Sequence, residues 1–268
     1  MPWQPTYIRR PDQVLKTAAD TVRVETDAGR GYLKAMGNHG GPHLLAADWV
    51  ATHLAQWLGL PTFDFALVTV TDEDEIVFLN NNRAQPGPAF ITRAESGTTW
   101  GGTAEELARL INPEDIGRLV VFDTWTRNCD RHPPDLAVRK PNRNNVFFSN
   151  EEMPDGQFQL IAMDHTHCFH CGRDLTPELE KIDLVKDERI YGLFPEFNPL
   201  VQAHWPAVEA AAAKLLTIDR HWIAGVVAQI PQEWQVTPDG RAALANQIVN
   251  RAGYVAETIG PSLQAAVN

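Results

Sequence analysis

Three polar residues that could hold metal ions and phosphates follow one another in the middle of the chain. Asp130 stands in the run Asn-Cys-Asp-Arg-His, where a helix-like segment ends abruptly. Asn145 opens the strand-like run NVFF, and Asp164 closes the strand-like run FQLIAMD. Carboxylate and amide oxygens are hard ligands that suit Mg²⁺. Enzymes that transfer phosphoryl groups use one carboxylate to orient a hydroxyl, and an amide and a second carboxylate to hold metal ions on the phosphates. The three residues are of the types that this arrangement needs.

The chain between Asn145 and Asp164 predicts a β-hairpin that brings these two residues together. Pro154-Asp155-Gly156 has the composition of a turn. Opposed residues of a simple antiparallel hairpin have a constant sum of numbers, and the midpoint of 145 and 164 falls inside this turn. We therefore expect the two residues almost opposite each other at the open end of the hairpin, where Asp130 also arrives. Either residue alone could be an ordinary cap or turn residue; the joint arrangement is what indicates a site.

A second group of possible metal ligands follows directly after Asp164. The run HTHCFHC, residues 165–171, contains three histidines and two cysteines. These are zinc ligands, and a zinc-stabilised scaffold or a metal-dependent hydrolase is one interpretation. The donors are too close in sequence for one compact tetrahedral site, so the alternative is a loop whose histidines line the cleft. Cys168-x-x-Cys171 as a redox pair is less favoured, because no thioredoxin-like βαβ pattern surrounds it.

The elements that must position these residues begin with a small sheet and one helix. Strand-like runs at 21–26 and 31–36 are joined by a glycine-containing turn. Apolar residues at helical spacing predict a helix over HLLAADWVATHLAQWLGL, which Gly59 and Pro61 end. Runs at 65–70 and 75–79 predict another hairpin.

The remainder of the chain is predicted to be mainly helical. The Asn-, Gly- and Pro-rich segment 80–101 is expected to be a connection. Thr103 and Glu106 have the spacing of a capping box at the start of the next helix. Further helices are predicted over 113–128, over 199–218 with a fresh start near Pro206, over 219–230 and over 239–259.

The composition excludes several classes of function. The chain has 268 residues and a net charge of −11, from 23 Lys and Arg against 34 Asp and Glu. Attraction to a nucleic-acid backbone is therefore not expected to drive its activity. The N-terminal run MPWQPTYIRRPDQ has no apolar core of a signal peptide, and no apolar run approaches membrane-spanning length. Three cysteines suit a reducing compartment, so we expect a cytoplasmic protein that binds neither nucleic acid nor membrane.

These polar residues and the first half of the chain together resemble a known family. The order Asn128-x-Asp130-Arg131-His132, then Asn145-Val-Phe-Phe, then Met163-Asp164-His165 is similar to the catalytic core of HipA-like serine/threonine kinases. Tyr32-Leu33-Lys34, followed by HLLAADWVATHLAQWLGLP, is similar to the lysine strand and first helix of that family. The phosphatidylinositol kinases have related Asp-Arg-His loops. The likeness covers roughly residues 20–170.

The resemblance implies an α+β, two-lobed, protein-kinase-like fold. A small lobe of sheet and helix would span residues 1–83, and a larger, mainly helical lobe with the catalytic loop and the metal-binding hairpin would span residues 84–268. The implied activity is transfer of phosphate from ATP, with Mg²⁺, to a hydroxyl, in the first place that of a serine or threonine in a protein substrate. A pseudokinase or nucleotide-binding interaction module without turnover, and a lipid or small-molecule kinase, are the alternatives.

The resemblance also implies roles for the residues of the large lobe. Asp130 becomes the catalytic carboxylate that orients or accepts the proton of the substrate hydroxyl. Arg131 and His132 would shape its loop, and Arg131 could also pair with a phosphate or a carboxylate. Asn145 and Asp164 become the Mg²⁺ ligands.

In the small lobe the resemblance makes Lys34 the cation on the α- and β-phosphates and Asp48 the acid that positions it. Taken alone, Lys34 could be an exposed lysine on an edge strand and Asp48 a solvated residue of a helix surface. The family usually has Glu at the position of Asp48. No G-x-G-x-x-G loop exists, so Gly29 and Gly31, or the glycines at 37, 40 and 41, are the candidates for a phosphate cradle.

Two further departures from the family concern the catalytic loop and the length of the chain. Kinase-type loops have an Asn five residues after the catalytic Asp, but that position is Asp135 here. We interpret Pro133–Asn144 as an insertion after which Asn145 keeps the metal-binding role, with Asp135 as the alternative ligand. The chain is shorter than full-length HipA-type toxins, so the resemblance does not imply an antitoxin-type partner.

Overall fold

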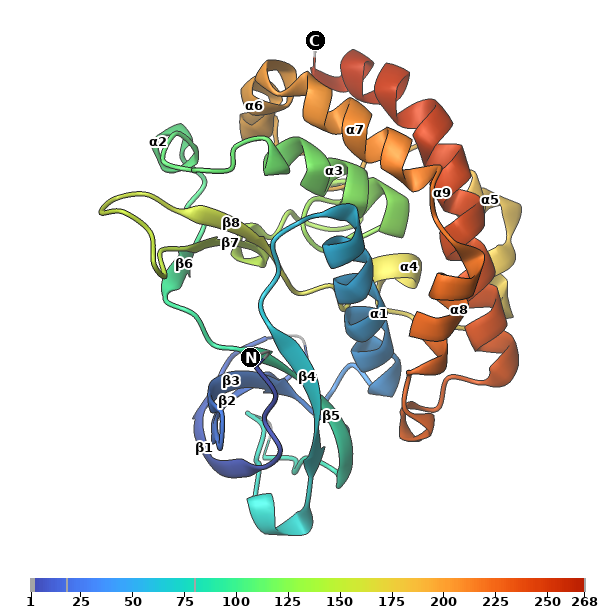
Figure 1. Cartoon of the computed structure of the whole chain (residues 1–268). Helices are drawn as coiled ribbons and strands as arrows, with labels where there is room; N and C mark the ends of the chain where they lie inside the picture. The colour runs from blue at the N-terminus through green and yellow to red at the C-terminus, as the bar shows by residue number, and fades with distance from the viewer. Residues whose placement is uncertain (1–2, 18, 80, 268) are drawn as a thin grey trace.

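The structure, a computed structural model, describes residues 3–17, 19–79 and 81–267 and consists of a small and a large lobe (Figure 1). A five-stranded sheet forms the small lobe, at the bottom of the view, and a three-stranded sheet lies with most of the helices above it. In chain order the elements are β1 (Ile8–Val14), β2 (Val22–Thr26), β3 (Gly29–Lys34), α1 (Pro42–Leu58), β4 (Phe65–Val70), β5 (Gly87–Arg93), β6 (Gly97–Thr99), α2 (Ala104–Leu107), α3 (Asp115–Thr126), β7 (Val146–Ser149), β8 (Gln159–Ala162), α4 (Cys168–Cys171), α5 (Ile182–Val185), α6 (Asn198–Ala203), α7 (Trp205–Leu215), α8 (Arg220–Ala228) and α9 (Pro238–Val267). The predicted α+β class, with a small sheet-bearing lobe and a larger, mainly helical one, is confirmed.

The five strands of the small sheet are antiparallel and ordered β1-β2-β3-β5-β4. The predicted hairpin of β2 and β3 is present, with Thr26 opposite Gly29 and a two-residue turn between them. Gly29 has a φ of 108°, which side chains rarely permit. A Cβ on Gly31 would lie 2.9 Å from the carbonyl oxygen of Thr92 in β5, so this glycine allows β3 and β5 to approach closely.

The prediction was wrong about the strand that pairs with β4. Residues 75–79 form no strand of the sheet, and β4 pairs along its length with β5. The Gly-Pro start of β5 resembles a connection, yet its central residues are buried between β3 and β4. The small sheet therefore extends to Arg93, beyond the predicted lobe boundary at residue 83.

Helix α1 stands between the small sheet and the helices of the large lobe (Figure 1). Pro42 lies in its first turn, and Gly59, with a φ of 95°, caps its last carbonyl groups. Leu45 and Leu54 are buried in the same apolar core as the helices of the large lobe. The large lobe thus holds this helix in place, while Asp48 on it faces the sheet and pairs with β3.

The second sheet, β6-β7-β8, contains the predicted hairpin. Val146 is opposite Ala162, and the pairing continues to Ser149 and Gln159. The opposed numbers therefore sum to 308, one less than for Asn145 and Asp164. Asn145 ends a 3₁₀ turn directly before β7, and Asp164 lies two residues after β8, so both residues lie at the open end of the hairpin.

Apolar packing of the helices fixes the end of α3, from which Asp130 follows. Ile116, Leu119 and Val120 of α3 are fully buried, as the predicted stripe requires. The capping box of Thr103 and Glu106 is present, and the helix predicted over 199–218 is broken between α6 and α7, just before Pro206. Helix α9 continues past its predicted end to Val267 and buries a stripe along its whole length against the other helices.

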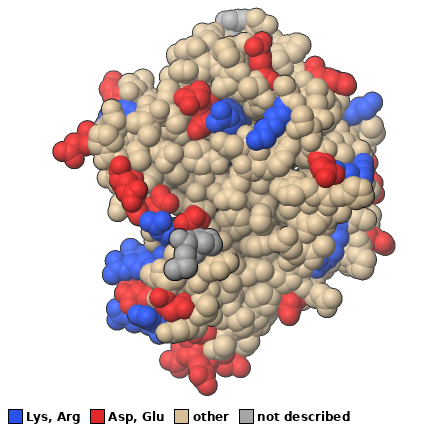
Figure 2. All heavy atoms as spheres, in the orientation of Figure 1, with Lys and Arg blue, Asp and Glu red and all other residues tan. Residues whose placement is uncertain are grey.

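Charged side chains of opposite sign are intermixed on the small lobe (Figure 2). Arg10 pairs with Glu25 at 2.9 Å and Arg23 with Asp12 at 2.7 Å. The face shown in Figure 2 has no broad basic surface. In the described parts of the chain, no helix combines the length and apolar character needed to cross a membrane.

Candidate active site

A cavity of about 430 Å³ lies between the small sheet, α1 and the β7–β8 hairpin. Lys34, Asp48, Asp130, Asn145 and Asp164 all line it. The other residues of its wall are mostly apolar, aromatic or hydroxyl-bearing, namely Leu15, Lys16, Thr17, Thr21, Tyr32, Thr52, Phe63, Phe90, Thr92, Thr99, Asn142, Asn144, Phe147, Ala162 and Met163. Five candidate residues from four distant segments thus share one cleft.

Lys34 binds two carboxylates that come from different parts of the chain. Its Nζ lies 2.6 Å from Oδ2 of Asp48 in α1 and 2.9 Å from Oδ1 of Asp164 after β8. The other oxygen of Asp48 accepts a hydrogen bond from the backbone N–H of His165, at 2.9 Å. Lys34 and Asp48 are buried. This excludes the alternatives that Lys34 is an exposed lysine of an edge strand and that Asp48 is a solvated residue of a helix surface. One buried cation therefore joins β3, α1 and the end of the hairpin.

The three charges of this group affect one another's protonation. Burial on its own would lower the pKa of Lys34, but the attraction of Asp164 and Asp48 outweighs burial and raises that pKa. Burial would raise the pKa of Asp164, but Lys34 and the hydroxyl of Thr166 lower it. The pKa of Asp48 is raised, because burial and the neighbouring Asp164 charge together outweigh Lys34. One ammonium is shared by two acids, so with both acids ionised the group carries a net negative charge that could hold a metal cation.

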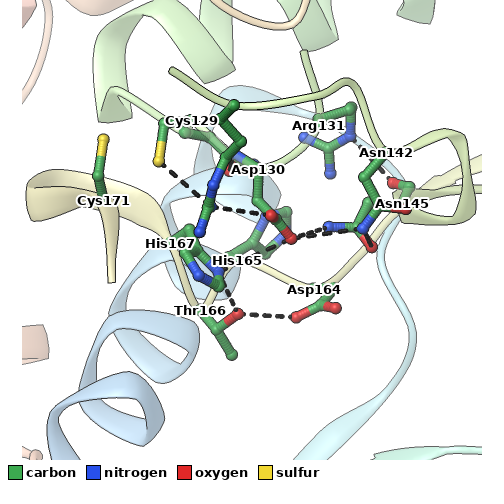
Figure 3. A network of polar contacts seen from close by, with 12 residues as sticks. Cys129, Asp130, Arg131, Asn142, Asn145, Asp164, His165, Thr166, His167 and Cys171 are labelled. Atoms are coloured by element: carbon green, nitrogen blue, oxygen red, sulfur yellow. Dashed lines mark hydrogen bonds and ion pairs between the residues drawn. The ribbon is translucent and has the colours of Figure 1, made fainter. Parts of the chain in front are cut away.

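Asp130 and Asn145 are in direct contact (Figure 3). The side-chain Nδ2 of Asn145 donates to Oδ2 of Asp130 at 2.8 Å. Helix α3 stops before Asp130 because Arg127 is left-handed, with a φ of 55°, and because Asn128 turns back. Its Nδ2 donates to Asp123 at 3.0 Å, and its Oδ1 accepts from the backbone N–H of Asp130 at 3.2 Å. The crowding of amides and charges at this turn therefore positions the Asp130 carboxylate.

Arg131 ties the turn after α3 to the β7–β8 hairpin. Its guanidinium donates to the backbone carbonyls of Asn145, at 3.0 Å, and Met163, at 2.8 Å, and it pairs with the carboxylate of Asp123. Arg131 is fully buried, so it pairs with a carboxylate and is closed to a phosphate. Through Arg131 the position of Asp130 is fixed relative to Asn145 and to the end of β8.

The chain matches, over residues 25–255, the family described as HipA-like kinase. It belongs to the HipA-like kinases. Among solved structures it is similar to the Helicobacter pylori proinflammatory kinase CtkA, with a TM-score of 0.57 and 12% identity over 98% of both chains. At this identity the likeness shows a common fold, which confirms the kinase-like architecture.

More distant likenesses are to WaaP in complex with acyl carrier protein and to HipA in its complex with HipB and operator DNA from Shewanella oneidensis MR-1. The WaaP match has a TM-score of 0.36 and 11% identity over 84% of this chain and 87% of that one. The HipA match has a TM-score of 0.44 and 12% identity over 92% of this chain and 67% of that one. No curated protein matches the sequence significantly.

In this HipA-like kinase His132 packs on an aromatic residue and is not part of the described cavity wall. Its ring packs edge-on against Phe194 with the ring centroids 4.9 Å apart, and its backbone carbonyl accepts from Gly192 at 2.9 Å. Burial lowers the pKa of His132, so the ring is neutral at pH 7. Its predicted role in shaping the loop agrees with these contacts, which are structural.

The segment Pro133–Asn144 separates the Asp130 turn from Asn145. Asp135 is exposed and does not line the cavity; its Oδ1 accepts from the backbone N–H of Ala137 at 2.9 Å. Asn142 and Asn144, at the end of the segment, do line the cavity. Asn145 therefore lines the cavity, and Asp135 does not.

The glycines proposed as a phosphate cradle lie outside the described lining of the cavity. Gly29 is in the β2–β3 turn, and Gly31 packs against β5. The wall of the cavity is instead completed by the turn between β1 and β2, through Leu15, Lys16 and Thr17. Sequence analysis missed this turn because β1, an edge strand with Pro11 beside an irregularity in its pairing, has no alternating apolar pattern.

The cluster at 165–171 is not arranged as a zinc site. Among the residues that the structure describes, no group of three or more His, Cys, Asp or Glu could hold a metal ion. Cys168 is buried and donates to the hydroxyl of Thr126 at 3.4 Å. The Cys171 thiol interacts with Cys129, which lowers the pKa of Cys171 to about 7, so Cys168 is not its partner.

Two of the histidines in this cluster lie near the Asp130 turn (Figure 3). Nδ1 of His167 lies 3.7 Å from Oδ2 of Asp130 and 3.1 Å from the hydroxyl of Thr166. His165 is fully buried, and its ring packs edge-on against Phe122. Burial lowers the pKa of both rings, so they are neutral. Of the two, His167 is the one that approaches the Asp130 carboxylate.

Sequence analysis missed three contributors to the site. Asp123 pairs with Arg131. It was missed because a single polar residue in a buried helix gives no local signal of a partner. Arg139 pairs with Asp130 at 2.9 Å, and Asn142 donates to the amide oxygen of Asn145 at 3.1 Å. The amide-rich run NRNN could have indicated Asn142, whereas nothing local to Arg139 indicates its contact.

Proposed function

We propose that this protein transfers the terminal phosphate of ATP, with Mg²⁺, to the hydroxyl of a serine or threonine in a protein substrate. The observation that carries the proposal is the convergence of Lys34, Asp130, Asn145 and Asp164 on one cleft. Membership of the HipA-like kinases supports the phosphotransferase class. A hydroxyl of a lipid or a small molecule is the alternative acceptor.

The residues present fit Mg²⁺. The amide oxygen of Asn145 and the carboxylate of Asp164 are hard oxygen donors that face the same cavity, and the Lys34 group retains an uncompensated negative charge. Mg²⁺ in such sites typically takes one or two protein carboxylates and completes its shell with phosphate and water. Asn145 and Asp164 would hold the ion, which when bound neutralises charge on the β- and γ-phosphates.

The cleft also fits a nucleotide. Tyr32, Phe63, Phe90 and Phe147 give part of its wall an aromatic character suited to a purine base. Lys34 lies two residues after Tyr32 on β3 and is paired with Phe90 of β5, and its ammonium could contact the α- and β-phosphates. Lys16, on the turn between β1 and β2, supplies a second cation to the same cavity.

Asp130 would then orient the acceptor hydroxyl and receive its proton. The carboxylate is held by Asn145 at 2.8 Å, and its turn is held by the fully buried Arg131. Fixed placement of the reacting groups, together with neutralisation of charge on the phosphates, accounts for most of the rate acceleration in phosphoryl transfer.

A nucleotide-binding module without turnover is the second candidate, and one observation favours it. The Asp130 carboxylate is occupied by Arg139, at 2.9 Å, so a protein in which this pair never opens would bind nucleotide and leave it intact.

Incubation with γ-³²P-ATP and Mg²⁺ decides between the two candidates. We expect the wild type to label itself or an added protein acceptor, and Asp130→Ala to lose at least about a thousandfold in labelling rate while still binding nucleotide. Nucleotide binding by a wild type that transfers no phosphate would establish the module, and full activity of Asp130→Ala would refute the assigned carboxylate. Acid hydrolysis of the labelled product to phosphoserine or phosphothreonine tests the acceptor.

A further inference from the structure

Asp130 is engaged by an arginine to which the family resemblance gives no role. Nη1 of Arg139 lies 2.9 Å from Oδ1 of Asp130, while Oδ2 accepts from Asn145 at 2.8 Å. Both carboxylate oxygens therefore already have protein donors. A carboxylate that receives a proton must present an oxygen to the hydroxyl, so Arg139 and the acceptor hydroxyl compete for Oδ1.

The segment that carries Arg139 is anchored on both sides of it. The backbone N–H of Arg139 donates to the carbonyl of Asp135 at 3.2 Å, and that of Asn142 donates to the carbonyl of Arg131 at 2.8 Å. Asp135 also caps this turn through Ala137. These hydrogen bonds fix the conformation of the segment, which places the Arg139 side chain beside the carboxylate of Asp130.

Arg139 is freer to change partners than the other arginines near the catalytic turn. Arg131 is fully buried, and Arg127 is buried and pairs with Asp187 at 3.0 Å. The Arg139 side chain is 35% exposed, and its other hydrogen bond is to the thiol of Cys129, at 3.5 Å, which is a weak acceptor. If the Arg139 guanidinium left Asp130 for a more highly charged anion, only the weak contact with Cys129 would also be lost.

The two lysines of the cavity lie on other elements than Asp130. Lys34 already serves Asp48 and Asp164, and Lys16 belongs to the turn between β1 and β2. Two lysines and three aspartates line the cavity, so its lining is negative before any metal binds. Within the described chain, Arg139 is the residue with a permanent positive charge that contacts Asp130.

We propose that Arg139 binds the terminal phosphate of the nucleotide and in doing so releases Oδ1 of Asp130 for the acceptor hydroxyl. This role rests on the phosphoryl transfer proposed above. The acceptor oxygen then bonds to the γ-phosphorus as the bond from that phosphorus to the bridging oxygen of ADP breaks, and the hydroxyl proton passes to Asp130. With ADP, which has no γ-phosphate, Arg139 stays on Asp130, so the insertion makes the catalytic carboxylate available only when a triphosphate is bound.

The test compares binding of Mg·ADP with binding of the Mg complex of the β,γ-imido analogue of ATP, by isothermal titration calorimetry. The preference for the triphosphate is the ratio of the affinity for the imido analogue to the affinity for ADP. We expect Arg139→Ala to lower this ratio about ten- to a hundredfold, the range for one charge-assisted hydrogen bond. ADP affinity should change by less than about threefold, because ADP lacks the phosphate concerned. Arg139→Lys should restore part of the preference, since it keeps the charge without the fork geometry.

Lys140→Ala is the matched control, because it removes a positive charge from the exposed neighbouring residue of the same segment. It should leave both affinities and the ATP turnover unchanged, whereas Arg139→Ala should lower kcat at least about tenfold. Thermal melting of each variant shows that the fold is retained, and Arg139→Lys remains informative if the alanine variant unfolds.

An Arg139→Ala variant with the wild-type preference for triphosphate would overturn the proposal. So would faster turnover with an unchanged preference, which would make Arg139 only an inhibitory contact. A wild type that binds neither nucleotide would refute the proposed function itself, which separates that failure from the failure of Arg139.

Discussion

The two ends of the cleft hold their acids in different ways. At one end the side chains of Lys34 and Asp48 are 11% and 2% exposed and belong to a central strand and a buried helix. At the other end the side chains of Asp130 and Arg139 are 17% and 35% exposed and belong to a turn and an inserted loop. The first pair is buried in regular structure, and the second is open to exchange.

This difference agrees with what each end would do in the proposed reaction. Groups that contact the α- and β-phosphates and the metal keep one geometry through the reaction, so burial in regular elements suits them. The groups at the acceptor end must exchange partners as substrate enters, which requires an exposed side chain on a loop. The fully buried Arg131 connects the two ends without itself being exposed to substrate.

The largest effect is expected from removing the cation of the buried end. Lys34→Ala leaves Asp48 and Asp164 without their counter-ion, and the loss of one partner of a buried pair costs about 3–5 kcal/mol of unfolding free energy. Phosphate transfer should become undetectable. Urea unfolding measures the first effect and γ-³²P labelling the second. For stability, Lys16→Ala is the control, because it removes an exposed lysine from the turn of the same cleft. Equal stability of both variants would contradict the described difference between the ends.

A smaller effect, on metal use, distinguishes Asn145 from Asp135. Asn145→Ala should raise the Mg²⁺ concentration for half-maximal activity about ten- to a hundredfold, because one hard ligand is lost. Asp135→Ala should change it less than about twofold, since its exposed carboxylate only caps its own loop. Titration of activity with MgCl₂ gives both values. The reverse outcome would make Asp135 the ligand.

The charge pairing of the buried end predicts a dependence of stability on acid pH. Because Lys34 and Thr166 lower the pKa of Asp164 below its ordinary 3.8, ionised Asp164 contributes stability at pH values above about 4. That contribution is lost as the pH falls through the lowered pKa. The stability difference between wild type and Asp164→Asn should therefore shrink between pH 5 and pH 3. Urea unfolding of both proteins at these pH values measures it, and a difference that grows on acidification would refute the pairing.

The smallest effect on stability is expected at the exposed end. Asp130→Asn keeps the shape of the side chain and loses only a partly exposed ion pair, for which about 1 kcal/mol or less is usual. Its melting temperature should lie within a few degrees of the wild type, although transfer is abolished. A loss of stability in Asp130→Asn as large as that in Lys34→Ala would show that the ion pairs at both ends are needed for the stability of the fold.

Local sequence patterns predicted the elements that carry the site. Helical periodicity predicted α1, α3 and the later helices, and turn chemistry predicted the β2–β3 and β7–β8 hairpins. These succeed because spacing and turn residues act within a few residues of chain. The hairpin also placed Asn145 near Asp164, with a register that differs from the observed one by a single residue, because Asn145 ends a 3₁₀ turn.

Other features depend on residues far apart in the chain. β5 looked like a linker because its environment, between β3 and β4, is created only by pairing. The turn between β1 and β2 lines the cleft, but the sequence did not predict it because the edge strand β1 has no alternating apolar pattern. The glycines expected to line the cleft are not part of its described wall.

The sequence by itself carried the resemblance to the HipA-like kinases, the order of the candidate residues and most of the elements that hold them, since spacing and turn chemistry act locally. Only the tertiary structure decided their partners: that Lys34 serves two acids, that His132 packs on Phe194, and that Arg139 reaches Asp130. The physical reason is that ion pairs and burial depend on distances in space. Those distances, including the one from the 133–144 segment to Asp130, are set only when the whole chain is packed.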